Sequence, residues 1–96
     1  MGYDLKPVKL RNQWGDGEPI WQRYNMAGWR ELNKLIREFK LRPLPQTNDG
    51  NLIVEKKCLA IAKIIFENQD RLQVEGLGFL TDHIEWWRNC GGCRVY

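Results

Sequence analysis

The chain has 96 residues, 43% of them hydrophobic and 28% charged, which is typical of one globular domain and excludes a disordered chain. Its net charge of +3 is lower than that of most nucleic-acid-binding domains, and its longest mostly apolar run, residues 58–66, is too short to span a membrane. The first residues lack the apolar core of a signal peptide, and three cysteines, an odd number, argue for reduced thiols. We therefore expect a cytoplasmic protein with no membrane partner.

The N-terminal quarter of the chain lacks the periodicity of a helix. Gly15, Gly17 and Pro19 mark tight bends, and partial alternation of polar and apolar residues over positions 8–14 leaves room for a short β element. The aromatic side chains of this segment are Tyr3, Trp14, Trp21 and Tyr24. Because large rings bury a large apolar area, we predict an ordered but irregular aromatic arm over residues 1–24 that packs on the domain.

Three amphipathic segments follow the arm. Apolar residues recur at spacings of three and four over residues 25–40, which predicts a helix that Asn25 caps and Pro43 stops. Two more apolar segments, separated by the glycine-rich sequence EGLG, predict helices over residues 50–69 and 79–90. The predicted fold is mostly α: a single three-helix domain over the whole chain, with the arm beside it.

Two short segments have the composition of turns. The loop before the second predicted helix carries Asn48 and Gly50 after two prolines, which is typical of a turn and a helix start. After the last predicted helix, Asn89, Gly91 and Gly92 predict a left-handed helix end that turns the chain back, because glycine adopts that conformation at little cost.

Cysteines flank the second turn and raise two chemical hypotheses. A redox-active CxxC places its first cysteine at a helix N-terminus, whereas Cys90 lies at a helix C-terminus, where the helix dipole opposes a thiolate; redox catalysis is therefore not supported. The spacing also suits half of a zinc site, and the complete set of soft ligands would be Cys58, His83, Cys90 and Cys93. The other interpretation is structural, with Cys58 as a small buried residue on the apolar face of its helix.

No catalytic set is recognisable in the sequence. The chain has no serine, and its one histidine would have to pair with a cysteine that lacks a nucleophile motif. A glycine-rich phosphate-binding loop is also missing from the sequence. We therefore predict a protein that is not an enzyme.

Five tryptophans in 96 residues are an excess, and Trp86 and Trp87 are adjacent. Neighbouring helical residues point in different directions, so we expect one ring to be buried and the other at least partly exposed, unless the arm covers both. Tryptophan beside arginine is typical of a protein-interface hot spot. The candidate binding residues are Trp21, Trp29, Arg30, Trp86 and Arg88.

Four motifs occur together: MGYDL at the start, WQRYNMAGWREL over residues 21–32, Asn-Asp-Gly over 48–50, and WWRNCGGCRVY at the end. They resemble an uncharacterised family of small bacterial and phage proteins that share a Gly-x-Asp-Leu arm, Asn-x-x-x-Trp-Arg-x-Leu, Asn-x-Gly, and an Asn-Ser/Cys-Gly-Gly-Phe end. The resemblance implies that Cys93 departs from the family pattern, and it implies a pair between Asp4 and Arg30 that ties the arm to the first helix. The positions it marks as special are Asp4, Trp29, Arg30, Asn48, Gly50, Asn89, Gly91 and Gly92.

We predict a non-enzymatic protein-interaction module. The resemblance further implies a phage-encoded inhibitor directed at a host protein or complex, such as a defence complex, in the manner of an anti-CRISPR protein. The alternative is a small zinc-stabilised nucleic-acid-binding or transcription-associated domain. Its phosphate contacts would be Lys6, Lys9, Arg11, Arg23 and Arg37. An enzyme of unrecognised type is the third hypothesis.

Overall fold

The computed structural model describes residues 2–9, 19–46, 49–72 and 80–96 of the chain. These ranges contain the helices α1 (Met26–Glu38), α2 (Glu55–Glu67) and α3 (Leu80–Asn89), the 3-10 helix η1 (Gln69–Leu72), and the strands β1 (Gly2–Pro7), β2 (Gln22–Asn25), β3 (Asn51–Ile53) and β4 (Cys93–Val95). The strands form one four-stranded antiparallel sheet in the order β2-β1-β4-β3. The prediction of a mostly α fold is therefore wrong, because the domain combines helices with a sheet.

The sheet was missed because its strands are short and pair over long distances in the chain. β1 and β4 lie at opposite ends of the sequence, yet Leu5 is opposite both Val95 of β4 and Gln22 of β2. A strand of three to six residues offers too little alternation to be told from a loop. The described part of the predicted irregular arm therefore contains strand β1 and most of β2. Most of the short β element predicted over residues 8–14, with Arg11 and Trp14, and the bends predicted at Gly15 and Gly17 lie outside the described residues.

The helices agree better with the sequence pattern. α1 confirms the first predicted helix, and the Asn25 side chain caps it by accepting a hydrogen bond from the backbone N–H of Gly28 at 2.6 Å. α2 begins later than predicted, because residues 51–53 pair with β4 as strand β3. α3 covers most of the third predicted helix. Over the described ranges, every helix falls short of the length and apolar character that crossing a bilayer requires.

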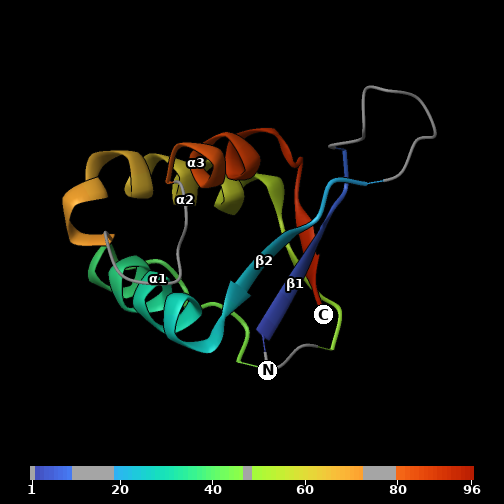
Figure 1. The fold of residues 1–96 in the computed structure, drawn as a ribbon, viewed down its shortest axis with the longest axis horizontal. Coiled ribbons are helices and arrows are strands. Elements are labelled where there is room, and N and C mark those ends of the chain that lie inside the picture. Colours follow the sequence, from blue (N-terminus) through green and yellow to red (C-terminus); the bar gives the residue numbers. More distant parts are fainter. Residues whose placement is uncertain (1, 10–18, 47–48, 73–79) are drawn as a thin grey trace.

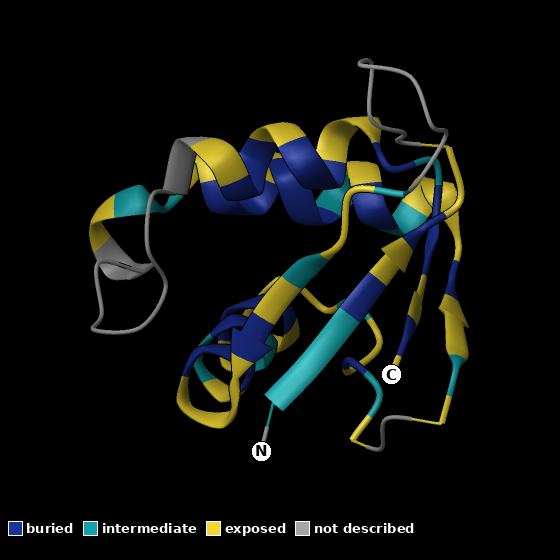
Figure 2. Cartoon of the chain, turned by 45° about the vertical axis from the view of Figure 1, so that its right-hand side comes forward, coloured by how far each residue is buried: buried dark blue, intermediate teal, exposed yellow. Residues whose placement is uncertain are grey.

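The helices lie to one side of the sheet, with α2 and α3 next to each other (Figure 1). Buried residues line the sides of α2 and α3 that face the rest of the domain, and exposed residues line their outer sides (Figure 2). Tyr24 of β2 and Trp87 of α3 are among the largest fully buried side chains. The core therefore fills the space between the helices and one face of the sheet, and no helix of the described ranges packs on the other face.

The turn after α3 agrees with its glycine-rich sequence. Gly91 and Gly92 have φ angles of 69° and 101°, values that side-chain-bearing residues rarely adopt. The Gly92 carbonyl accepts a hydrogen bond from the backbone N–H of Val8 at 2.9 Å, so the turn is also joined to the end of β1. The predicted reversal is confirmed, and it delivers β4 to the centre of the sheet between β1 and β3.

Candidate binding face

Alternate residues of the strands point away from the helices. In β1 the exposed Lys6 lies between the buried Leu5 and Pro7, and in β4 the exposed Arg94 lies between two buried residues. Successive side chains of a strand point to opposite faces of a sheet, so the exposed set shares the face opposite the core. We call this surface the open face and define it as Asp4, Lys6, Trp21, Arg23, Leu52, Arg94 and Tyr96.

Two aromatic side chains meet on the open face. The ring centroids of Trp21, just before β2, and Tyr96, just after β4, lie 5.7 Å apart with their planes tilted by 44°. Because β1 lies between β2 and β4, the rings meet across β1. Trp21 and Tyr96 remain 46% and 40% exposed, so much of their apolar area is still in contact with solvent.

The charged residues of the open face are mostly cationic. Arg23 donates a hydrogen bond from Nε to Oδ1 of Asp4 at 2.6 Å. This pair corrects the predicted one, since Asp4 pairs with Arg23 on the neighbouring strand and Arg30 lies on α1. Lys6 and Arg94 are directly opposite each other on β1 and β4, and Arg94 donates a hydrogen bond from Nη1 to the Gly50 carbonyl at 2.9 Å.

Lys6 and Arg94 place like charges on neighbouring strands, and neither has an ion pair with a carboxylate of the described residues. Among the described residues the recorded ion pairs join Lys9 to Glu55, Arg23 to Asp4 and Arg88 to Glu85. Directly opposite residues of antiparallel strands have Cβ atoms about 4.5–5.5 Å apart, so like charges there destabilise the sheet. The register of Lys6 and Arg94 therefore places two like charges on neighbouring strands, which is expected to cost some stability.

Lys6→Thr is expected to leave the free energy of unfolding unchanged or to raise it by up to about 1 kcal/mol, because it removes this repulsion and threonine suits a strand. Arg23→Thr is the matched control on the same face and should act in the opposite direction, because it removes the ion pair with Asp4. Urea unfolding of both variants measures the two effects. A lower stability for Lys6→Thr than for Arg23→Thr would contradict the repulsion.

A hollow lies between the two like charges. Its volume is about 270 Å³, and it is lined by Lys6, Pro7, Val8, Arg94 and Tyr96. A second hollow of about 320 Å³ lies nearby around the Asp4–Arg23 pair and is also lined by Gly2, Tyr24 and Asn25. The open face thus combines two shallow depressions, an exposed aromatic pair and an excess of positive charge.

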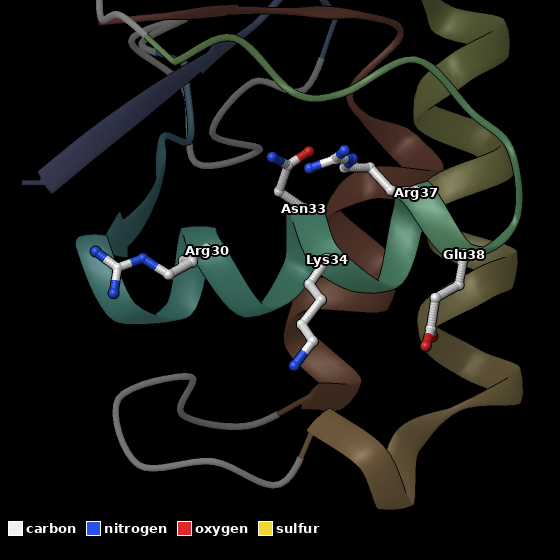
Figure 3. A pocket seen from close by; sticks show the side chains of 5 residues that line it. All are labelled: Arg30, Asn33, Lys34, Arg37 and Glu38. Atoms are coloured by element: carbon white, nitrogen blue, oxygen red, sulfur yellow. The ribbon is translucent and has the colours of Figure 1, made fainter.

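A larger hollow of about 500 Å³ lies on α1 and is lined by Arg30, Asn33, Lys34, Arg37 and Glu38. Figure 3 shows that these side chains diverge: Lys34 and Glu38 point to one side of α1, Asn33 and Arg37 to the other, and Arg30 toward the N-terminal end of the helix. The Asn33 side chain is already engaged, because its Oδ1 accepts a hydrogen bond from the backbone N–H of Leu44 at 2.7 Å. The cations therefore do not converge on one ligand.

Two of the five predicted binding residues are buried. The Trp29 indole N–H donates to the Pro45 carbonyl at 2.9 Å, and its ring stacks on Tyr3. Trp86 is 4% exposed, and its indole N–H donates to the Ile20 carbonyl at 2.7 Å. Of the two alternatives for Trp86 and Trp87, the structure supports the one in which both rings are covered, because Trp87 faces the core and the segment before β2 covers Trp86.

The other three predicted binding residues are at the surface, but in different places. Arg30 lies on α1, and Arg88 on α3 pairs with Glu85 at 3.0 Å. Trp21 lies on the open face. The sequence pattern does not identify Tyr96 or Arg94 as binding residues, because their position beside β1 depends on the pairing of β1 with β4.

Gly50 and Asn89, two of the turn residues predicted from the sequence, lie in the described part of the chain. Gly50 has a φ angle of 85°, and an added Cβ would lie 3.2 Å from the Tyr96 ring. The Asn89 side chain donates to the Glu85 carbonyl at 2.7 Å, which satisfies a carbonyl in the last turn of α3. Asn48 lies outside the described residues. Gly50 thus holds the loop against the aromatic ring of the open face.

A buried polar network joins β2 to α3. The Tyr24 hydroxyl accepts a hydrogen bond from the Trp87 indole N–H at 2.9 Å and lies 2.8 Å from Nδ1 of His83. The network is satisfied when the phenol donates to Nδ1, which puts the proton of a neutral His83 ring on Nε2. Burial raises the pKa of Tyr24 well above its ordinary value, more than the hydrogen bond from Trp87 lowers it.

Tyr24→Phe is expected to lower the free energy of unfolding by about 1–3 kcal/mol, because it leaves buried groups of Trp87 and His83 without their partner. The raised pKa of the folded phenol also implies a pH dependence. Tyr24 ionises more easily in the unfolded chain, so its contribution is complete below about pH 10 and declines as the pH rises further. Urea unfolding at neutral and alkaline pH checks both. The gap between the two proteins should narrow at alkaline pH, and a constant gap would contradict the assignment.

The three cysteines are fully buried and reduced, and they lie together in the core. Interaction among the three thiols lowers the pKa of Cys90 and raises the pKa of Cys58 and Cys93. The thiols of Cys58 and Cys90 are placed to donate hydrogen bonds to the Ile53 and Trp87 carbonyls at 3.7 and 3.4 Å.

The predicted zinc ligands are only partly brought together. The three thiols are close enough to shift one another's pKa, whereas Nδ1 of His83 faces the Tyr24 hydroxyl. Within the described residues, no group of three or more histidine, cysteine, aspartate or glutamate side chains is placed to hold a metal ion. Zinc binding stays a prediction, which metal analysis of the purified protein would test.

Comparison with known proteins gives no match to a family model, to a curated protein or to a solved structure. The resemblance to small phage proteins therefore stays a prediction.

Proposed function

We propose that the protein is a non-enzymatic protein-interaction module that binds its partner with the open face. The observation that carries the proposal is the contact between Trp21 and Tyr96, two large rings that remain 46% and 40% exposed on a sheet face that no helix of the described residues covers. Tryptophan, tyrosine and arginine are the residues most enriched among those that contribute most to protein binding. The open face contains all three residue types, as Trp21, Tyr96, Arg23 and Arg94.

The charge of the open face favours an acidic protein partner. Lys6, Arg23 and Arg94 contribute positive charge, and the one carboxylate of the face, Asp4, is paired with Arg23. Nucleic-acid-binding surfaces usually carry more cations than this, and the net charge of the whole chain is +3. An inhibitor of a host defence complex, as the resemblance implies, would need a binding face of this kind.

Substitutions on the open face, with a control substitution on α1, test the proposal. Immobilised wild-type protein, Trp21→Ala, Tyr96→Ala and the α1 variant Arg37→Ala are exposed to a lysate, and each captured protein is then purified and titrated against all four. The partner is expected to bind Trp21→Ala and Tyr96→Ala at least about 30-fold more weakly, as for a residue that contributes 2 kcal/mol or more. Arg37→Ala should bind like wild type.

Circular dichroism provides the folding control. Trp21 and Tyr96 are substantially exposed, so both variants should retain the wild-type spectrum. Partners that bind all variants equally, or that lose affinity only for Arg37→Ala, would refute the open face as the binding surface.

A further inference from the structure

We infer that the hollow between Lys6 and Arg94 is a subsite for a carboxylate of an acidic, extended protein segment. This inference rests on the proposed function and gives the chemistry of the partner. The subsite consists of two cations on neighbouring strands, the Tyr96 ring at one side, and Pro7 and Val8 as its apolar lining.

The position of the two cations is the first argument. Lys6 and Arg94 are directly opposite each other, and among the described residues neither forms an ion pair with a carboxylate. Arg23 next to them has such a carboxylate, Asp4, at 2.6 Å. A negative group bound between Lys6 and Arg94 would turn a repulsion within the sheet into two attractions.

The size of the hollow is the second argument. A cofactor or drug-sized ligand requires about 300–1,000 Å³ of largely enclosed space, whereas this depression holds about 270 Å³ at the surface. That volume suits one or two side chains. Arginine forms directed hydrogen bonds with carboxylates, and the apolar lining suits the methylene groups that carry the carboxylate of glutamate.

The surroundings favour protein over nucleic acid. A bound single strand needs cations along several phosphates, and the further cation of the face, Arg23, is already neutralised by Asp4. The cations of α1, such as Lys34 and Arg37, line a different hollow on the outer side of that helix. The aromatic pair beside the subsite suits apolar side chains that alternate with the carboxylates of an extended segment.

Titration of the isotope-labelled full chain tests the inference by the chemical shifts of its backbone amides. The probes are a peptide of alternating glutamate and valine, the same peptide with glutamine in place of glutamate, and oligothymidine. The glutamate peptide is expected to cause saturable shifts around Lys6 and Arg94, and the glutamine peptide to bind at least about fivefold more weakly. The double variant Lys6→Gln/Arg94→Gln should lose the same factor, and the control Lys34→Gln/Arg37→Gln should not.

Three results would overturn the inference: equal binding of the two peptides, absence of saturable shifts with the glutamate peptide, or stronger binding of oligothymidine at the same amides. Binding assays with the partner captured from the lysate distinguish failure of the carboxylate subsite from failure of the proposed function. If that partner requires Trp21 but binds Lys6→Gln/Arg94→Gln like wild type, the open face is correct and the carboxylate subsite is wrong. If it requires neither, both are wrong.

Discussion

Trp87→Ala is expected to lower the free energy of unfolding by about 3–5 kcal/mol, which is a large part of the 5–15 kcal/mol that stabilises a typical domain. Trp87 is fully buried, contacts the edge of Trp86, and donates its indole N–H to the Tyr24 hydroxyl. Truncation would leave a cavity between α3 and β2 and would also leave the Tyr24 hydroxyl without its donor. Urea unfolding followed by circular dichroism measures the loss.

Trp21→Ala is the matched control for Trp87→Ala, because it removes the same side chain from the surface. Trp21 is 46% exposed and its ring contacts Tyr96, so its loss should cost much less stability. Trp87→Ala should therefore lower mainly the free energy of unfolding, whereas Trp21→Ala should lower mainly the affinity for the partner. Equal stability losses would mean that Trp87 is not a core residue.

Gly92→Ala is expected to lower the free energy of unfolding by about 2–3 kcal/mol. The φ angle of Gly92 is 101°, and an added Cβ would lie 3.3 Å from the Ile53 carbonyl oxygen and 3.4 Å from the Glu55 nitrogen. These neighbours belong to the backbone of β3 and the start of α2, so they cannot move aside cheaply. Thermal or urea unfolding of the variant measures the effect.

Gly91→Ala, at the adjacent position, provides the comparison. Its φ angle of 69° lies in the left-handed region, where alanine costs about 1 kcal/mol, and its added Cβ would lie 2.9 Å from Cβ and 2.5 Å from Cδ of Lys9. A hydrogen bond from the Lys9 backbone N–H to the Cys90 carbonyl at 2.8 Å holds Lys9 in place, so rotation of its side chain does not relieve the overlap with its Cβ. Both variants should therefore be clearly destabilised, Gly91→Ala at least as much as Gly92→Ala, and both should weaken binding, since the turn positions Arg94 and Tyr96. A Gly91→Ala variant as stable as wild type would contradict the geometry of the turn.

Features that depend on neighbouring residues were predictable from the sequence. The spacing of apolar residues predicts α1, the Asn25 side chain caps it, and the paired glycines predict the reversal after α3. Each follows from the conformational preference of a few consecutive residues, which the rest of the fold leaves in place.

Features that depend on distant parts of the chain were not predictable in this way. Periodicity suggests that adjacent tryptophans on a helix cannot both be inward, yet Trp86 is covered by the segment that carries Ile20. The resemblance paired Asp4 with Arg30, whereas the register of β1 and β2 puts Arg23 opposite Asp4. In both cases the deciding contact comes from the N-terminal arm, whose strands show little local pattern.

The sequence by itself therefore determined a small domain with helices at three places, a capped first helix and a turn at the end, because local backbone preferences specify these. Only the tertiary structure decided that the two chain ends pair as β1 and β4. That pairing sets Lys6 opposite Arg94 and brings Tyr96 to Trp21. The candidate binding face follows from strand register, and register depends on long-range hydrogen bonds and burial that no short stretch of sequence contains.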